Sequence, residues 1–283
     1  MKKYNTINIS HETPIAMLQE SLKYNDYEYV LAHLYNAEPE YKAFYKKAVK
    51  NKRHVLLDNS IFELGESFDP IEYTKIIQDL RPTEYIVPDV LEDSDATIAK
   101  FEYWKENHLN EVQGIPIGVV QGKTYKDIKN CMKFMIENVD RIAISFDYSY
   151  YLTIGRGDSD WEKLADGRCR MIEMLKDDLL LPYNKSYHLL GCSLPQEFLH
   201  VNSFKFVKKM FDSMDTSNPI VHGILGHRYE GEDGIRGLPD KQKILLADLI
   251  HSKPNKKQLE DIKYNVDAFR YIMEESGYSN NYD

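Results

Sequence analysis

Cysteine and long apolar runs are both scarce in this sequence. The three cysteines, Cys131, Cys169 and Cys192, lie far apart among 283 residues. Their number and spacing exclude a disulfide framework and a structural zinc site, so we expect buried, unreactive thiols. No stretch approaches the roughly 20 apolar residues that a membrane-spanning helix needs. The first residues include Lys2 and Lys3 but no apolar signal core, which predicts a cytoplasmic protein.

The signatures of common cofactors are missing as well. There is no glycine-rich phosphate-binding loop, and the Gly155-Arg156-Gly157 segment is too short to count as one. The histidines form no metal-ligating constellation. The sequence therefore predicts neither a cofactor nor a bound metal.

Positive charge is also in short supply. The formal net charge is −9 at pH 7, from 36 lysines and arginines against 45 aspartates and glutamates. Nucleic-acid-binding proteins neutralise phosphates with lysine and arginine, so this balance argues against broad nucleic-acid binding. Basic residues gather in three clusters, at residues 46–53, 205–209 and 253–257, which fit either solvated helix faces or a basic rim.

The chain does carry a regular alternation of short apolar runs and amphipathic stretches. Hydrophobic residues make up 42% of the sequence, enough for a sizeable core. Between many of the runs, apolar residues recur three or four positions apart, which predicts helices and therefore parallel strands with right-handed crossovers. About eight strands favour a single (β/α)8, TIM-type barrel domain over residues 1–283. The predicted strands are residues 29–32, 55–57, 85–87, 115–120, 141–145, 187–190, 210–214 and 220–224.

Two places interrupt this alternation, so we expect a somewhat irregular barrel. Residues 147–170 follow the fifth predicted strand and are rich in tyrosine and glycine, which indicates an inserted loop of the kind that often forms a lid. Only residues 215–219 separate the last two predicted strands, too few for a helix. Either the barrel lacks one helix or one strand is misassigned. The tail from 239 to 278 predicts C-terminal helices that close the barrel.

Polar residues follow the predicted strands at the same end of each. The carboxyl ends of barrel strands converge on one mouth, where active sites lie. Carboxylates gathered there raise one another's pKa toward the range useful for acid–base catalysis. Taken singly, an aspartate after a strand is as often a helix N-cap. The candidate residues are Asp58, Ser60, Asp89, Gln121, Gly122, Phe146, Asp147, His188, Gly191, Asp212 and Asp215.

Several short segments resemble the tRNA-guanine transglycosylases, in the order in which that family carries them. The similarity covers roughly residues 29–224. The matching segments are Leu-Asp-Asn-Ser at 57–60, Val-Pro-Asp at 87–89, Val-Val-Gln-Gly at 119–122, His-Leu-Leu-Gly at 188–191 with Pro195 soon after, and Met-Phe-Asp-Ser at 210–213.

The sequence also departs from that family. The family's cysteine-rich zinc site is absent, the chain is much shorter, and Ser60 is followed by Ile61 and Phe62 where the family has two glycines. In these respects the chain is similar to compact, zinc-free, phage-type enzymes that place 7-deazaguanine in DNA. DNA is therefore the expected partner ahead of tRNA.

The resemblance implies a base exchange in which an aspartate displaces guanine from its nucleoside and a 7-deazaguanine then takes its place. In this interpretation Asp58 moves the proton, and Asp89 and Gln121 bind the purine edge. A tyrosine, Tyr148 or Tyr150, would stack on the base. Substrate-binding roles also fall to Ser60, Gly122, Phe146, Asp147, His188 and Gly191.

Two residues compete for the role of nucleophile. Motif matching selects Asp212, whereas position at the end of a strand favours Asp215. The two have opposite side-chain parity in a regular strand, so only one faces the barrel interior unless a bulge intervenes. Position leads us to prefer Asp215.

Other functions compatible with the sequence remain in view. A barrel lyase or hydrolase acting on a small metabolite suits the negative charge, and a tRNA-modifying enzyme or a non-catalytic binding barrel is a further alternative. The acidic balance also leaves room for a homodimer or an accessory protein that delivers the nucleic acid.

Overall fold

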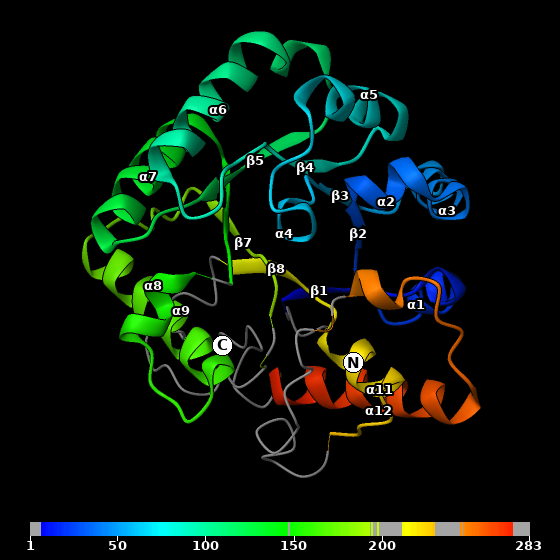
Figure 1. The fold of residues 1–283 in the computed structure, drawn as a ribbon. Coiled ribbons are helices and arrows are strands. Elements are labelled where there is room, and N and C mark those ends of the chain that lie inside the picture. Colours follow the sequence, from blue (N-terminus) through cyan, green and yellow to red (C-terminus); the bar gives the residue numbers. More distant parts are fainter. Residues whose placement is uncertain are drawn as a thin grey trace, which may run out of the picture.

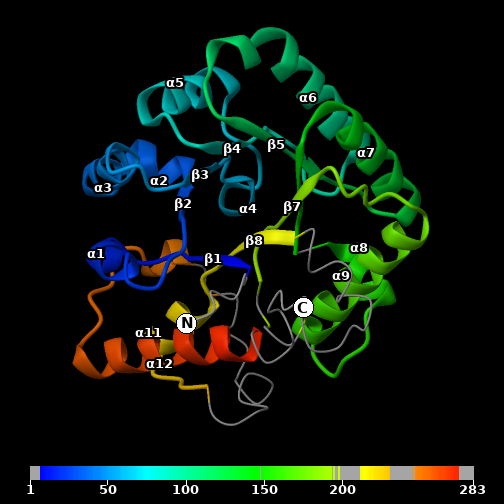
Figure 2. The same cartoon turned by 180° about the vertical axis from the view of Figure 1, so that it is seen from behind.

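The computed structural model of the chain describes residues 7–146, 148–192, 194, 197, 211–229, 244 and 246–273. Eight parallel strands form one sheet in the order β1-β8-β7-β6-β5-β4-β3-β2. Helices surround this sheet on its outside, as Figures 1 and 2 show from opposite sides. The predicted (β/α)8, TIM-type barrel is confirmed.

The strands are short and mostly buried, as expected where helices cover a parallel sheet. They are β1 (Asn8–His11), β2 (Glu28–Leu31), β3 (Val55–Asp58), β4 (Glu84–Ile86), β5 (Ile115–Val120), β6 (Arg141–Ile144), β7 (Ser186–Leu189) and β8 (Phe211–Thr216).

Amphipathic stretches form most of the helices, and side-chain caps fix several of their starts. Asp69 caps α5, and Thr124 and Asp127 form a capping box at the start of α7. In the described part of the chain no helix has the length and apolar character to cross a bilayer. The α-helices are α1 (Leu18–Ser21), α2 (Ala32–Ala37), α3 (Pro39–Lys50), α4 (Ile61–Leu64), α5 (Pro70–Leu80), α6 (Ser94–Asn107), α7 (Tyr125–Asn138), α8 (Ser149–Ile154), α9 (Asp160–Asp177), α11 (Asn218–Ile224) and α12 (Lys256–Met273), with 3-10 turns η1 (Ile15–Met17), η2 (Leu109–Glu111) and η4 (Leu246–Leu249).

The strand predicted at residues 220–224 is wrong, because this segment belongs to helix α11. A short apolar run does not distinguish a buried strand from a buried helix by periodicity alone. Ile220 and Ile224 pack with Ile262 and Val266 of α12, and the two helices lie side by side in both views. The true additional strand is β1, whose sequence Asn-Ile-Ser-His has too little apolar character to stand out.

The prediction of a loop at residues 147–170 is also wrong, because most of this stretch is helical. This stretch contains α8 and the first part of α9, which together occupy the helical position between β6 and β7. Ser159 and Glu162 form a capping box that starts α9. Gly167 of α9 lies so close to α8 that an added Cβ would meet the Tyr151 backbone oxygen at 2.3 Å. The many tyrosines and glycines here therefore reflect close helix packing. The predicted C-terminal helices are present as η4 and α12.

Side chains close the barrel between β1 and β2, the strands at the two ends of the sheet order. The backbone N–H of His11 donates to Asn25 Oδ1 at 2.8 Å, and Asn25 Nδ2 donates to the backbone oxygen of His11 at 3.2 Å. The backbone N–H of Tyr29 donates to Ser10 Oγ at 3.1 Å. Polar side chains thus satisfy backbone groups that a strand ladder would otherwise pair.

We expect Asn25→Ala to lower the free energy of unfolding by about 1–3 kcal/mol, because it leaves buried backbone groups of His11 without their partner. Urea denaturation followed by circular dichroism measures this change. Asn51→Ala, at an exposed asparagine directly after α3, serves as the control and should shift stability by less than about 0.5 kcal/mol. Equal stabilities of the two variants would contradict a role for Asn25 in closing the barrel.

Candidate functional site at the carboxyl ends of the strands

A cavity of about 140 Å³ opens at the carboxyl ends of the strands. Every strand contributes to its lining, either directly or through the residue that follows it, so the cavity lies where barrel enzymes carry their active sites. These positions are Glu12 after β1, Tyr29 and Leu31 in β2, Asp58 in β3, Ile86 in β4, Val119 in β5, Ser145 after β6, Leu190 after β7, and Asp215 and Thr216 in β8.

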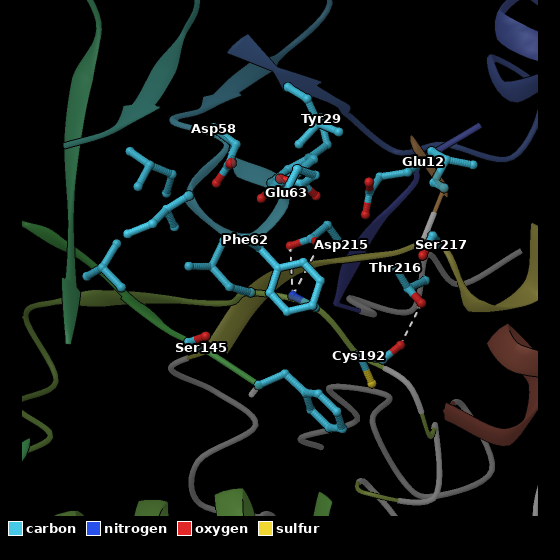
Figure 3. A pocket seen from close by; sticks show the side chains of 18 of the residues that line it. Glu12, Tyr29, Asp58, Phe62, Glu63, Ser145, Cys192, Asp215, Thr216 and Ser217 are labelled. Carbon is cyan, nitrogen blue, oxygen red and sulfur yellow. Dashed lines mark hydrogen bonds between the residues drawn. The ribbon is translucent and has the colours of Figure 1, made fainter. Parts of the chain in front are cut away.

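The acidic and basic side chains that line the described cavity are all of one kind, carboxyl groups. Among the described residues that line it, all charged side chains are acidic: Glu12, Asp58, Glu63, Asp89 and Asp215. In Figure 3 the carboxyl groups of Glu12, Glu63 and Asp215 point toward a common space. The cavity therefore favours ligands that donate hydrogen bonds and disfavours phosphate groups.

Asp58 is the last residue of β3, and a tight turn holds its carboxyl group. The backbone N–H of Ser60 donates to Asp58 Oδ1 at 2.6 Å, and Ser60 adopts a left-handed conformation with φ of 60°. Burial raises the pKa of Asp58 well above its ordinary value, and the neighbouring Glu63 carboxylate raises it further. The hydrogen bonds from Ser60 and Tyr29 offset part of this shift. Asp58 is therefore suited to carry a proton near neutral pH.

Asp89 forms the centre of a buried polar network. Asn59 Nδ2 donates to Asp89 Oδ1 at 2.7 Å, and Gln121 Nε2 donates to Asp89 Oδ2 at 2.7 Å. Gln121 Oε1 in turn accepts from the backbone N–H of Glu92 at 2.8 Å, which fixes the amide orientation. Burial raises the pKa of Asp89, and the two amide donors counteract this rise. Asp89 is held rigidly and keeps lone pairs that a ligand N–H group can use.

Asp215, near the end of β8, is bound by residues of the neighbouring strand β7 and of the turn after it. Its carboxylate accepts hydrogen bonds from Gly191 N, at 3.1 Å to each oxygen, and Oδ1 lies 3.0 Å from His188 Nε2. The bonds from Gly191 are drawn as dashed lines ending on Asp215 in Figure 3. Gly191 has φ of +61°, a conformation that suits glycine. These contacts fix the carboxylate at the cavity wall.

Aromatic rings line other parts of the cavity. Phe146 and Trp161 stack on each other with centroids 5.9 Å apart and planes 13° apart. Phe62 of α4 also lines the cavity and is 51% exposed, so its ring is accessible to a ligand. Tyr148 and Tyr150, predicted to stack on a base, are outside the lining: the Tyr148 hydroxyl donates to the Val120 backbone oxygen, and Tyr150 contacts Met174.

A buried arginine on α9 supports this wall from behind. Arg168 is completely buried and forms an ion pair with Glu197 at 2.7 Å. The guanidinium also donates to the backbone oxygens of Leu190 and Gly191, at 3.0 and 2.8 Å, and lies 4.9 Å from the ring centroid of Phe146. Arg168 thus holds both the turn that binds Asp215 and one aromatic wall.

The structure brings together six of the residues predicted from the sequence. Asp58, Asp89, Gln121, Phe146, Gly191 and Asp215 all line the cavity. Ser60, Gly122 and His188 lie behind the lining: Ser60 Oγ accepts from the backbone N–H of His33, and Gly122 allows close approach to the start of α7. Asp147 lies outside the described residues.

Asp212 lies at the opposite, amino-terminal end of the barrel. Phe211 pairs with Tyr187 and Ser213 pairs with His188, so Asp212 is an extra residue in β8 where the register shifts. Its side chain is 46% exposed and forms an ion pair with Arg141 at 2.7 Å. Of the two candidate nucleophiles, Asp215 is therefore the one that lines the cavity.

Several residues that shape the site were not predicted from the sequence, among them the lining residues Glu12, Phe62, Glu63 and Trp161 and the supporting residue Arg168. Glu12 follows β1, a strand that the sequence pattern did not indicate. Phe62 and Glu63 lie on α4, a single helical turn too short for a periodic signal. Trp161 and Arg168 belong to α9, within the stretch taken for a loop.

The described residues include no group of three or more histidine, cysteine, aspartate or glutamate side chains arranged to bind a metal ion. All three cysteines are free and buried, as predicted. In comparisons with known proteins, no protein-family model matches the chain and no curated protein is significantly similar to it.

We expect Arg168→Met to lower the free energy of unfolding by about 3–5 kcal/mol, because it leaves the Glu197 carboxylate buried without a counter-charge. Arg170→Met, on the same helix but in a partly exposed pair with Asp166, should cost less than about 1 kcal/mol. Denaturant unfolding of both variants tests the difference. Adding Glu197→Gln to Arg168→Met should recover part of the loss, and an additive double variant would refute the coupling.

The raised pKa of Asp58 implies a pH-dependent cost to stability. In the unfolded chain an aspartate ionises near pH 3.9, so between that pH and the higher folded-state pKa the folded protein binds more protons. Stability contributed by this group is therefore complete at low pH and is lost as pH rises through the folded-state pKa.

Asp58→Asn should consequently raise the free energy of unfolding by about 1 kcal/mol at pH 8, with a smaller gain at pH 4. Urea titrations at the two pH values measure the difference. Asp140→Asn, at an aspartate whose side chain is 93% exposed, is the control. A variant that is less stable than the parent at pH 8 would contradict this account of Asp58.

Proposed function

We propose that the chain is a base-exchange transglycosylase that replaces guanine in nucleic acid, DNA ahead of tRNA, with a 7-deazaguanine. The observation that carries this proposal is the pairing of two carboxyl groups in one cavity: Asp215, fixed by hydrogen bonds, and Asp58, whose neutral form is favoured by burial. A retaining glycosyl transfer uses two carboxyl groups in different environments, one as the nucleophile and one as the acid and base.

In the first step, an oxygen of the Asp215 carboxylate forms a bond to C1′ of the target nucleoside. The bond between C1′ and the guanine nitrogen breaks, and the departing base takes a proton from the Asp58 carboxyl group. In the second step, the incoming 7-deazaguanine loses its ring N–H proton to Asp58, and that nitrogen bonds to C1′. The bond to Asp215 breaks, the carboxylate is regenerated, and configuration at C1′ is retained.

Base recognition falls to the other lining groups. The lone pairs left on Asp89 accept hydrogen bonds from the N–H groups of the purine edge, while Gln121 and Asn59 hold the carboxylate in place. The exposed ring of Phe62 offers a stacking surface, and stacking of a base on an aromatic ring is worth about 1–3 kcal/mol. A flipped base needs such an enclosed pocket.

The uniformly acidic lining supports one alternative of a different class. A barrel hydrolase acting on a small, uncharged nucleoside or glycoside would use the same two carboxyl groups, with water in place of the incoming base. Such an enzyme needs no phosphate contacts, which suits the net charge of −9.

Incubation with labelled guanine and either duplex DNA or bulk tRNA, at several salt concentrations, tests the proposal. We expect label to enter DNA, and Asp215→Asn to abolish both incorporation and covalent trapping of nucleic acid on denaturing gels. Asp212→Asn, which alters the competing aspartate outside the cavity, should retain exchange.

Incorporation into tRNA alone would keep the reaction but overturn the preference for DNA. Release of guanine from free nucleosides without any incorporation would favour the hydrolase. Incorporation into neither nucleic acid at any salt concentration would rule out the transglycosylase.

A further inference from the structure

A chain of buried hydrogen bonds runs through the barrel interior from its amino-terminal end to Asp215. Arg141 Nη2 donates to Ser213 Oγ. Ser213 Oγ lies 2.8 Å from His188 Nδ1, and His188 Nε2 lies 3.0 Å from Asp215 Oδ1. His188 and Ser213 are directly opposite each other in the β7–β8 register, which the extra residue Asp212 sets.

The number of protons in this chain determines which nitrogen of His188 is protonated. A guanidinium group only donates, so the Ser213 oxygen accepts from Arg141. Within the described part of the chain, the partners of the Ser213 hydroxyl are Arg141 and His188, which leaves His188 Nδ1 to accept the hydroxyl hydrogen. A neutral imidazole with an accepting Nδ1 carries its proton on Nε2. That N–H points at Asp215.

The surroundings of His188 hold this arrangement in place. The ring is completely buried, it stacks on Tyr29 with centroids 6.2 Å apart, and Tyr27 meets it edge-on at 6.3 Å. Burial raises the pKa of both phenols, so they stay uncharged. The charged groups that face His188 or the end of its hydrogen-bond chain are Asp215 in β8, Arg141 in β6, Asp212 in β8 and Glu84 in β4.

Arg141 is itself anchored from several directions. Its guanidinium contacts Asp212 at 2.7 Å, Ser186 Oγ at 3.1 Å and Glu84 at 3.1 Å. These partners come from β8, β7 and β4. An arginine held in this way has little freedom to turn away from Ser213, so the direction of the hydrogen-bond chain is built into the barrel.

We propose that His188 is a positioning residue, held as the Nε2–H tautomer by the Arg141–Ser213 pair, and that its donated hydrogen bond orients the Asp215 carboxylate toward the cavity. His188 thus acts through Asp215, and the sequence-based expectation that it binds substrate directly is replaced. The catalytic meaning of this arrangement rests on the proposed function, whereas the tautomer itself does not.

Long-range ¹H–¹⁵N NMR spectra of the folded protein test the tautomer directly. We expect the His188 signals to show an unprotonated Nδ1 and a protonated Nε2 at neutral pH, with His188→Gln used for assignment. This measurement needs no other variant and no activity. A proton on Nδ1, or an imidazolium ion at neutral pH, would overturn the proposal.

Two serine variants test the origin of the tautomer. Ser213→Ala removes the donor to Nδ1, and we expect the His188 signals to shift toward a mixture of tautomers or a doubly protonated ring. Ser21→Ala removes a different buried hydroxyl, on α1, that donates to the Leu18 backbone oxygen, and it should leave the His188 signals unchanged. Unchanged His188 signals in Ser213→Ala would also refute the proposal.

The same pair of variants links the tautomer to catalysis. In the base-exchange assay we expect Ser213→Ala to lower kcat about tenfold, with little change in KM, because the Asp215 carboxylate loses its orientation and not its contact with bound substrate. Ser21→Ala should alter neither kcat nor KM. A Ser213→Ala variant with the kcat and KM of the parent would refute the positioning role. If the NMR spectra show the expected tautomer but the protein has no exchange activity, the tautomer assignment holds and the proposed function is wrong.

Discussion

The carboxylate of Asp215 is the constraint on which the rest of the site depends. It is buried, so it requires hydrogen-bond donors, and His188 and Gly191 supply them from β7 and its following turn. Gly191 adopts a positive φ, and the peptide that carries its N–H is held because Arg168 donates to the backbone oxygen of Leu190. The position of one carboxyl group is thus determined jointly by two strands and by α9.

Asp58 and Asp89, which come from the neighbouring strands β3 and β4, have surroundings that differ from those of Asp215. Asp89 is surrounded by amide donors, which makes it a fixed acceptor. Asp58 has the Glu63 carboxylate nearby, and this neighbour adds to the effect of burial in raising its pKa. Different environments suit similar side chains to different tasks, which is how one cavity can hold both the proton carrier and the nucleophile that we propose. Keeping these acids buried lowers the stability of the fold, as expected for a functional site.

The sequence predicted the barrel because buried parallel strands leave short apolar runs in it, whereas the covering helices leave apolar residues three or four positions apart. It also placed Asp58, Asp89, Gln121 and Asp215 together, because carboxyl ends of barrel strands converge whatever their exact lengths. The misassigned strand at 220–224 shows the limit of this reasoning. Apolar character alone does not separate a strand from a buried helix, and β1 is recognisable only through its pairing with β8.

The residues that escaped prediction share a physical cause. Phe62 and Glu63 reach the cavity because one turn of helix, α4, folds back over the end of β3, a local event without periodic signal. Arg168 acts across a distance in sequence, since its partners lie beyond β7. His188 faces the barrel interior beside Ser213 only because the register of β8 shifts at Asp212. Near such a shift, the face to which a side chain points depends on how the two strands pair. The local amino-acid sequence does not reveal that pairing.

The acidity of the cavity is compatible with a nucleic-acid substrate only if a single base enters it. Phosphates meeting five carboxyl groups would be repelled, whereas a purine presents N–H donors to the same groups. The basic end of α3 does not compensate, because α3 ends at Lys50, shortly before β3 begins, and so lies at the amino-terminal end of the barrel. Selectivity at the described cavity must then come from recognition of the base itself. In the reaction that we propose, Asp89 and Phe62 would provide it, because they offer acceptors and a stacking surface.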